Sequence, residues 1–188
     1  GLGAMGSGMA RLMIEKTGLK IVAVVDARPD YVGKDLGDVL NLGKKAGVKV
    51  TNDPSTVLKK EKVDIVVIAT TSWLKEQIPD LRKILRAGLN CVSIAEEMAD
   101  AYAQNPRLAK ELDKLAKDNG VTIVGTGVNP GFVLDFLVVA LTAGSHSVER
   151  IEASRVNDLS PYGPTVMNSQ GVGTSPAQFK TGVADGSI

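Results

Sequence analysis

The sequence predicts an α/β fold whose first domain is a doubly wound parallel sheet. Short β-branched runs alternate with segments whose apolar residues recur at helical spacing, and this alternation continues to about residue 127. Glycine or proline stands near the ends of most segments, where helices stop or start. Strands that are joined by helices in this way run parallel, and the helices cover both faces of the sheet.

Each element follows from the pattern of its own segment. Four apolar residues at helical spacing before Gly18 predict the first helix. Asp53 and Pro54 form an N-cap and N1 pair for a brief helix. The most apolar strand, residues 63–70, is expected in the middle of the sheet. In full, we expect helices over residues 4–16, 34–46, 73–87 and 105–120, and strands over residues 21–26, 48–51, 63–70, 89–95 and 121–127.

The character of the sequence changes after residue 130. A mostly buried helix is expected after Pro130, and residues 149–159 alternate as a half-exposed strand does. Residues 159–173 are rich in Pro, Gly, Ser and Asn and predict a loop, and residues 175–186 predict a short helix. We therefore expect a Rossmann-type domain over residues 1–130, followed by the start of an α+β domain over residues 131–188 that the sequence leaves unfinished.

The composition limits the partners. The net charge is +1 and the basic residues are scattered, so we expect no nucleic acid and no membrane partner. The most apolar run, residues 132–143, is interrupted by Asp135 and is about half as long as the roughly 20 residues of a membrane span. Cys91 is the single cysteine, which favours a cytoplasmic setting, and His146 is the single histidine, so no metal site is expected.

The chain opens on GLGAMG, a G-x-G-x-x-G run typical of dinucleotide binding. Gly1 permits a tight turn, Gly3 lets the backbone approach a pyrophosphate, and Gly6 lets the following helix pack on the sheet. The run alone is a weak signal, since a flexible, glycine-rich start is the alternative explanation. Asp26 strengthens it, because this acid ends the next strand twenty positions after Gly6, where a carboxylate binds the ribose 2′-hydroxyl. Because such a loop follows a strand, we also expect a strand upstream of Gly1.

Asp26 favours NAD over NADP, because a carboxylate repels a 2′-phosphate. Arg28 would pair with that phosphate, or is simply an exposed loop charge, so NADP stays open as a second cofactor. Further cofactor contacts are expected after later strands, in ATTSW (69–73) and GTGVNPGF (125–132). The cofactor-binding residues expected in all are Gly1, Gly3, Ala4, Met5, Gly6, Asp26, Arg28, Ala69, Thr70, Thr71, Asn129 and Pro130.

Two adjacent carboxylates, Glu96 and Glu97, follow the strand at residues 89–95. They are either a solvated helix start or, beside a nicotinamide, a general base or an ammonium-binding acid. Thr71 and Ser72 carry the same ambiguity, since they would contact the nicotinamide ribose, cap the next helix, or do both.

The stretches GLGAMGSGMA, VVDARPDYVGKDLGDV, IAEEMA, GTGVNPGFVLD and HSVERIEASRVNDLSPYGPTVMNSQGVG resemble the 2,4-diaminopentanoate dehydrogenase family, among the dihydrodipicolinate reductase-like proteins. The chain also resembles native NAD(P)-dependent amine dehydrogenases. The resemblance implies oxidative deamination of a small amine, with hydride passing to the nicotinamide and ammonia released. It also implies an acid in the substrate cleft, which matches Glu96 or Glu97, and a substrate domain that continues beyond residue 188.

Some assignments stay open at this level. Asn157 and Asp158 would bind a second polar group of the substrate, or are merely a polar strand end. A homodimer formed through the second domain is expected. The alternatives to an amine dehydrogenase are a dihydrodipicolinate-type reductase and a non-catalytic dinucleotide sensor. The reductase family is characterised by a histidine-rich motif with a nearby lysine, which the region around His146 lacks.

Overall fold

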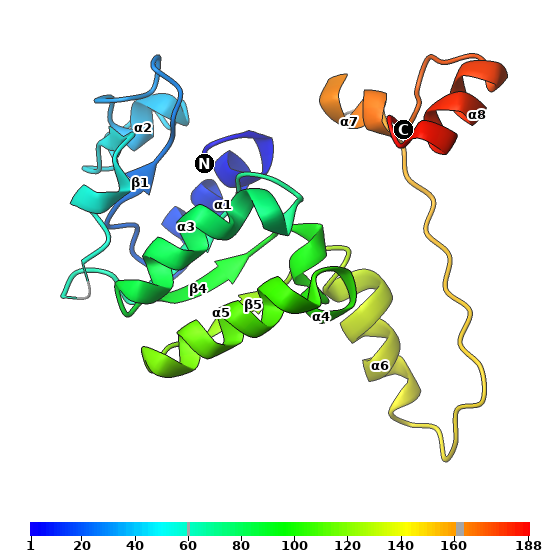
Figure 1. Ribbon diagram of the computed structural model, residues 1–188. Helices are drawn as coiled ribbons and strands as arrows, with labels where there is room; N and C mark the ends of the chain where they lie inside the picture. The colour runs from blue at the N-terminus through cyan, green and yellow to red at the C-terminus, as the bar shows by residue number, and fades with distance from the viewer. Residues whose placement is uncertain (60, 161–163) are drawn as a thin grey trace. The chain divides into compact units, whose positions relative to one another are not determined.

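The computed structural model describes residues 1–59, 61–160 and 164–188, which separate into two compact units (Figure 1). The first unit is Gly1–His146 and the second is Ser147–Ile188. The helix that follows Pro130 thus falls with the first unit. The functional domain boundary at residue 130 stays a prediction.

All paired strands of the first unit run parallel, which confirms the α/β fold. Strand β1 (Val24–Val25) pairs with β2 (Val50–Thr51), and β3 (Ile65–Ile68), β4 (Asn90–Ser93) and β5 (Ile123–Gly125) form a second sheet in that order. Within the described residues β1 and β3 do not pair, and the strand expected upstream of Gly1 stays a prediction.

The expectation that residues 63–70 lie in the middle of the sheet is wrong for the described pairing. β4 has a partner on each side, whereas β3 is hydrogen-bonded to β4 alone. Ile65 at the start of β3 is half exposed, while Cys91 in β4 is buried. Apolar character predicted the strand itself correctly, but the number of hydrogen-bonded neighbours decides which strand is central.

Two apolar clusters hold these sheets. Helices α3 (Leu74–Arg86) and α5 (Pro106–Asp118) pack against each other beside β4, and their buried residues include Leu81, Leu85 and Leu112 (Figure 1). A second cluster joins α1 (Ala4–Glu15), the short helix α2 (Leu36–Val39) and β2. The remaining elements of this unit are η1 (Pro54–Thr56), η2 (Glu96–Met98), α4 (Ala101–Gln104), η3 (Phe132–Phe136) and α6 (Leu137–Thr142).

The predicted helix over residues 34–46 shortens to α2 because Asp35 folds the segment into a loop. Its carboxylate accepts hydrogen bonds from the backbone N–H groups of Gly37 (2.7 Å), Ala46 (2.8 Å) and Gly47 (2.9 Å). The side chain thereby competes with the helical backbone pattern, as Asp side chains often do near helix starts. Asp53 caps η1 as expected, accepting from the N–H of Ser55.

Several expectations after residue 130 are wrong. The helix after Pro130 begins near its expected position, at Phe132, but Phe136 and Leu141 are exposed rather than buried. Residues 149–159 form no strand, and Val156 is 97% exposed, since no described residue pairs with this segment. An alternating pattern gives a segment one apolar face. A strand forms only where a neighbouring strand also supplies backbone hydrogen bonds.

The segment 159–173 holds a short helix, α7 (Pro164–Ser169), where a loop was expected, and its residues 161–163 lie outside the described residues. The last helix, α8 (Pro176–Asp185), agrees with the prediction. Ser175 and Gln178 form a reciprocal capping box at its start, and Gly186 closes it with a φ of 78°.

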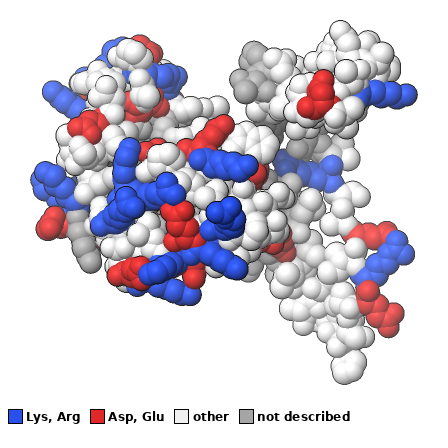
Figure 2. All heavy atoms as spheres, viewed as in Figure 1, with Lys and Arg blue, Asp and Glu red and all other residues white. Residues whose placement is uncertain are grey.

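The surface and helix lengths agree with the composition. On the face shown in Figure 2, basic and acidic side chains are interspersed rather than gathered by sign. No helix of the described chain has both the length and the apolar character needed to cross a bilayer.

Candidate functional site

The glycine loop at the start of the chain packs closely upon itself. A Cβ added at Gly6 would lie 1.9 Å from the carbonyl oxygen of Gly1, and one added at Gly1 would lie 2.9 Å from that of Ala69, just beyond β3. A Cβ at Gly3 would meet no atom within 4 Å. The fold itself therefore requires glycine at position 6, whereas at position 3 it leaves open space.

That open space suits the phosphates of a dinucleotide. Gly3 is the N-cap of α1 and offers no side-chain cap, so the first backbone N–H groups of the helix face outward. Unpartnered N–H groups and the positive end of the helix dipole together attract an anion. Ala4 and Met5 are exposed at this end of the helix. The loop thus fits a pyrophosphate on its own geometry.

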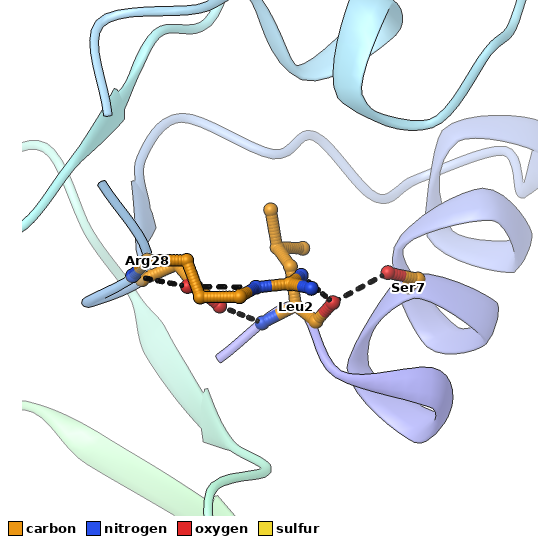
Figure 3. Close-up of polar contacts among 4 residues, drawn as sticks. Leu2, Ser7 and Arg28 are labelled. Atoms are coloured by element: carbon orange, nitrogen blue, oxygen red, sulfur yellow. Dashed lines mark hydrogen bonds and ion pairs between the residues drawn. The ribbon is translucent and has the colours of Figure 1, made fainter. Parts of the chain in front are cut away.

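Asp26 ties this loop to the end of β1 (Figure 3). One carboxylate oxygen accepts from the N–H of Leu2 at 2.5 Å, and the other accepts from the N–H of Arg28 at 2.8 Å and from its Nε at 3.4 Å. Arg28 Nη2 in turn donates to the Leu2 carbonyl at 2.6 Å, which also accepts from Ser7 Oγ at 2.8 Å. The glycine loop and the Asp26 region therefore form one hydrogen-bonded unit.

Asp26 remains ionised although only 8% of its surface is exposed. Burial acts to raise its pKa, but the backbone hydrogen bonds from Leu2 and Arg28 and the charge of Arg28 outweigh this effect, so the pKa is lowered. The contact of this carboxylate with a ribose hydroxyl stays a prediction. Arg28 is 45% exposed, and its guanidinium lies 3.5 Å from the ring centroid of Tyr31.

The loops that follow β3, β4 and β5 meet at the same edge of their sheet. The parallel register places Ile68, Ser93 and Gly125 side by side at the strand ends. Backbone hydrogen bonds join the loops, from Glu97 to the Ser72 carbonyl (3.3 Å) and from Thr126 to the Ser93 carbonyl (2.9 Å). The structure thus brings the predicted segments 69–73, 93–99 and 125–132 together.

Glycine also permits this approach. A Cβ at Gly125 would lie 2.0 Å from the carbonyl oxygen of Met98, so η2 packs directly on the end of β5. In the next turn, which contains Asn129 and Pro130, a Cβ at Gly131 would lie 2.5 Å from the backbone nitrogen of Gly127. Larger residues at positions 125 and 131 would push the turns of the site apart.

Glu96 and Glu97 occupy different environments, although sequence alone did not separate them. Glu97 Oε2 accepts from the N–H of Leu74 at 2.8 Å and from Asn105 Nδ2 at 3.1 Å, so this carboxylate caps the start of α3. Glu96 is exposed, and its side chain makes no hydrogen bond within the described part of the chain. The Glu97 carboxylate is thus held by hydrogen bonds within the fold, whereas the Glu96 carboxylate faces solvent.

The structure shows the helix-capping role that the sequence left open for Thr71. Its hydroxyl accepts from the N–H of Trp73 at 3.4 Å and donates to Glu76 in the first turn of α3. Thr71 therefore supports the start of this helix, while Thr70 beside it is exposed. The proposed contacts of Ala69, Thr70 and Thr71 with a cofactor stay predictions.

Sequence reasoning missed two buried polar residues beneath the site, Gln77 and Ser93, each 0% exposed. Ser93 Oγ donates to Gln77 Oε1 at 2.6 Å, and Gln77 Nε2 donates to the Thr71 carbonyl at 3.1 Å. A polar residue on the apolar face of the predicted helix at 73–87 was the available signal. It went unused because Gln is ordinarily a surface residue.

Asn157 and Asp158 lie in the second unit, and their role in substrate binding stays a prediction. Asn157 Oδ1 accepts from Arg155 Nε at 2.7 Å. Asp158 accepts from the backbone N–H and hydroxyl of Ser160, and these two bonds lower the pKa of the carboxyl group. In the first unit, burial raises the pKa of the Cys91 thiol to about 12, which makes it unsuited to nucleophilic work near neutral pH.

Comparison with known proteins gives two family matches. Residues 1–67 match the N-terminal domain of dihydrodipicolinate reductase, and residues 132–188 match the C-terminal domain of 2,4-diaminopentanoate dehydrogenase. The 2,4-diaminopentanoate dehydrogenase of Acetoanaerobium sticklandii is 40% identical over 190 residues, covering 100% of this chain and 53% of that protein. Over its full length the chain is therefore similar to 2,4-diaminopentanoate dehydrogenase. The resemblance inferred from the motifs is thereby confirmed.

Two further relatives agree with this resemblance. An amine dehydrogenase of Streptomyces virginiae is 25% identical over 164 residues, covering 86% of this chain and 46% of its own length. The solved structure of the amine dehydrogenase from Mycobacterium smegmatis superposes with a TM-score of 0.80 at 33% identity, over 97% of this chain and 54% of that one. The chain spans about half the length of the curated relatives it matches. With the glycine loop, these relatives indicate a nicotinamide cofactor.

Alanine at Gly3 should weaken dinucleotide binding without unfolding the protein. Its Cβ has open space in the fold but occupies the side from which a pyrophosphate approaches, so we expect the dissociation constant of NADH to rise about tenfold, a change of about 1.4 kcal/mol. Titration of NADH fluorescence and a thermal unfolding curve, both on the whole protein, measure the two effects.

Gly6→Ala is the matched comparison. Its Cβ would overlap the Gly1 carbonyl, so this variant should lose both thermal stability and NADH affinity. Wild-type NADH affinity in Gly3→Ala would show that the pyrophosphate does not approach the loop at this glycine.

Because of Asp26, the free energy of unfolding should fall at acidic pH. Its lowered folded-state pKa means that its contribution is complete above the unfolded-state value of 3.8 and is lost as the pH falls through the lower folded-state value. At about pH 7, Asp26→Asn should lower the free energy of unfolding by about 1–3 kcal/mol, because an amide NH₂ then faces a backbone donor.

Urea unfolding at several pH values tests this, with the exposed Asp30→Asn as the control variant. The loss of stability between about pH 5 and pH 3 should be smaller in Asp26→Asn than in the wild type. Identical acid sensitivity in the two proteins would contradict the assignment.

Proposed function

We propose that the whole protein is an NAD(P)-dependent amine dehydrogenase that oxidatively deaminates a small amine or diamino acid such as 2,4-diaminopentanoate. One observation carries the proposal: Glu96, whose carboxylate makes no hydrogen bond with the described residues, stands at the sheet edge where loops 69–73 and 125–132 gather, in a chain whose glycine loop fits a dinucleotide. Three of the matching proteins support the choice of substrate class, since they are named as amine dehydrogenases or as a 2,4-diaminopentanoate dehydrogenase.

Glu96 acts as the general base. An exposed carboxylate accepts the proton of the substrate ammonium, which leaves a neutral amine whose lone pair assists loss of hydride from the adjacent carbon. The bound nicotinamide supplies the acceptor for that hydride. Water then adds to the resulting iminium, and ammonia leaves as the carbonyl product forms. Thr70 and the turn at Asn129 and Pro130 border the cofactor.

Glu97 plays a different part. Its Oε2 already accepts two hydrogen bonds, from the N–H of Leu74 and from Asn105 Nδ2, so this carboxylate holds the starts of α3 and α5 in place. Its backbone N–H meanwhile holds the loop that follows β3. Glu97 is therefore a positioning residue, and Glu96 is the one that moves a proton.

NAD is the preferred cofactor and NADP is the second. The ionised Asp26 accepts hydrogen bonds from ribose hydroxyls and repels a 2′-phosphate. Arg28 stands beside it, stacked on Tyr31 and partly exposed, where its free donors meet a phosphate. The cytoplasmic location, the homodimer and the substrate contacts of Asn157 and Asp158 belong to the same proposal and rest on sequence and family resemblance.

Substrate range tests the proposed function. The whole protein is given NAD or NADP with a panel of short diamines, amino acids and monoamines, and NAD(P)H formation is followed by absorbance. We expect amine-dependent reduction that is strongest with 2,4-diaminopentanoate and faster with NAD. Cofactor binding without any turnover favours the dinucleotide sensor, and NAD(P)H-dependent reduction of a dihydrodipicolinate-type substrate favours the reductase.

Glutamine substitutions separate the two acids. Glu96→Gln should lower kcat by about 10²–10⁴-fold with little change in stability, because general-base catalysis contributes about that much. Glu97→Gln should instead lower thermal stability, with a smaller effect on kcat. If the double variant turns over as fast as the wild type, neither acid is the base; if Glu97→Gln alone abolishes turnover, the two roles are reversed.

A further inference from the structure

A continuous chain of hydrogen bonds crosses the core beneath the strand ends. The N–H of Ala95 donates to Ser93 Oγ at 3.1 Å, Ser93 Oγ donates to Gln77 Oε1 at 2.6 Å, and Gln77 Nε2 donates to the Thr71 carbonyl at 3.1 Å. Apart from Asp26, Gln77 and Ser93 are the buried polar residues of the described chain. The chain links the loop after β3 to the turn after β4.

The direction of the chain follows from its chemistry. A carbonyl only accepts, so the Thr71 oxygen requires the NH₂ end of the Gln77 amide. The amide oxygen then faces Ser93, whose hydroxyl must donate to it and keeps its lone pairs for the Ala95 N–H. Each polar atom has one compatible role, and neither an amide flip nor a hydroxyl rotation satisfies all four groups. The arrangement therefore specifies a single relative position of Thr71 and Ala95.

Packing alone gives no reason for glutamine here. The neighbouring buried residues of α3 are Leu74, Ile78 and Leu81, all apolar, and a buried amide is unfavourable unless its hydrogen bonds are made. Methionine or leucine fills such a site without that cost. What glutamine adds is a directed connection between two loops.

Both ends of that connection lie next to residues of the site. Ala95 immediately precedes Glu96, and Thr71 lies in the segment expected to border the cofactor. The backbone bonds from Glu97 to Ser72 and from Ile94 to Ile68 join the same two segments, and the Gln77 chain adds a side-chain connection in the core. A shift of this side-chain connection would move the base relative to the cofactor-facing loop.

We propose that Gln77 is a positioning residue for amine oxidation, which acts through Ser93 to hold the Glu96 turn at a set distance from the 69–73 loop. This inference rests on the proposed function. Gln77 touches neither substrate nor cofactor, and it sets the alignment on which hydride and proton transfer depend. Small misalignments of reacting groups reduce turnover far more than binding.

The test uses Gln77→Met, which keeps the volume and removes both hydrogen bonds, and Leu81→Met as its control. Leu81 is also fully buried and lies one turn further along α3, and it makes no side-chain hydrogen bond. In the whole protein, Gln77→Met should lower kcat about tenfold or more, with the KM for amine and the NADH dissociation constant within about twofold of wild type. Leu81→Met should change none of these.

Amide hydrogen exchange supplies a readout that does not depend on turnover. Segments 69–74 and 93–98 should exchange faster together in Gln77→Met and remain as in the wild type in Leu81→Met. Ser93→Ala should also lower kcat and speed up exchange in the two segments. It takes the place of Gln77→Met in the test if that variant does not fold. The double variant should be no slower than either single variant, because both interrupt one chain.

The outcomes are distinguishable. Wild-type kcat and exchange in Gln77→Met and Ser93→Ala would overturn the inference, as would lowered thermal stability with kcat unchanged, which marks a purely structural role. Absence of amine turnover in the wild type would refute the proposed function alone. Exchange in the two segments would then still decide whether Gln77 couples the loops.

Discussion

The parallel register of β3, β4 and β5 is the constraint on which the candidate site depends. Because the three strands run in one direction and end side by side at Ile68, Ser93 and Gly125, the three segments that leave them must share one edge of the sheet. A shift of β4 by one residue would move Ser93 off the buried face and break its bond to Gln77. The register of the strands therefore also determines where Glu96 lies.

Around this edge, the structure distinguishes carboxylates by what they are bonded to. Asp26 is buried but ionised, since backbone donors and Arg28 stabilise its charge more than burial disfavours it. Glu97 is committed to the starts of two helices, whereas Glu96 faces solvent. Three acids in similar positions after strands therefore take three roles: one anchors the glycine loop, one braces the helices, and one remains available for proton transfer.

Local patterns predicted the first unit well and the second unit poorly. The helices at residues 74–86 and 106–118 have long apolar faces and clear stop signals, so spacing alone located them to within a residue or two. The predicted helix at 34–46 failed because the Asp35 carboxylate accepts hydrogen bonds from N–H groups at both ends of that segment, and the predicted strand at 149–159 failed because no described residue pairs with it. Neither side-chain hydrogen bonds nor strand partners can be read from apolar spacing.

The amino-acid sequence by itself determined the alternation of strands and helices, the glycine loop with Asp26 beyond it, and the resemblance to 2,4-diaminopentanoate dehydrogenase. These features depend on residue type and short-range spacing, which the chain carries at every stage of folding. Only the tertiary structure decided which glutamate is open and how Gln77 meets Ser93, sixteen residues away. Hydrogen-bond partners become defined only when packing brings separate segments into one orientation, and burial then makes each unmet bond costly.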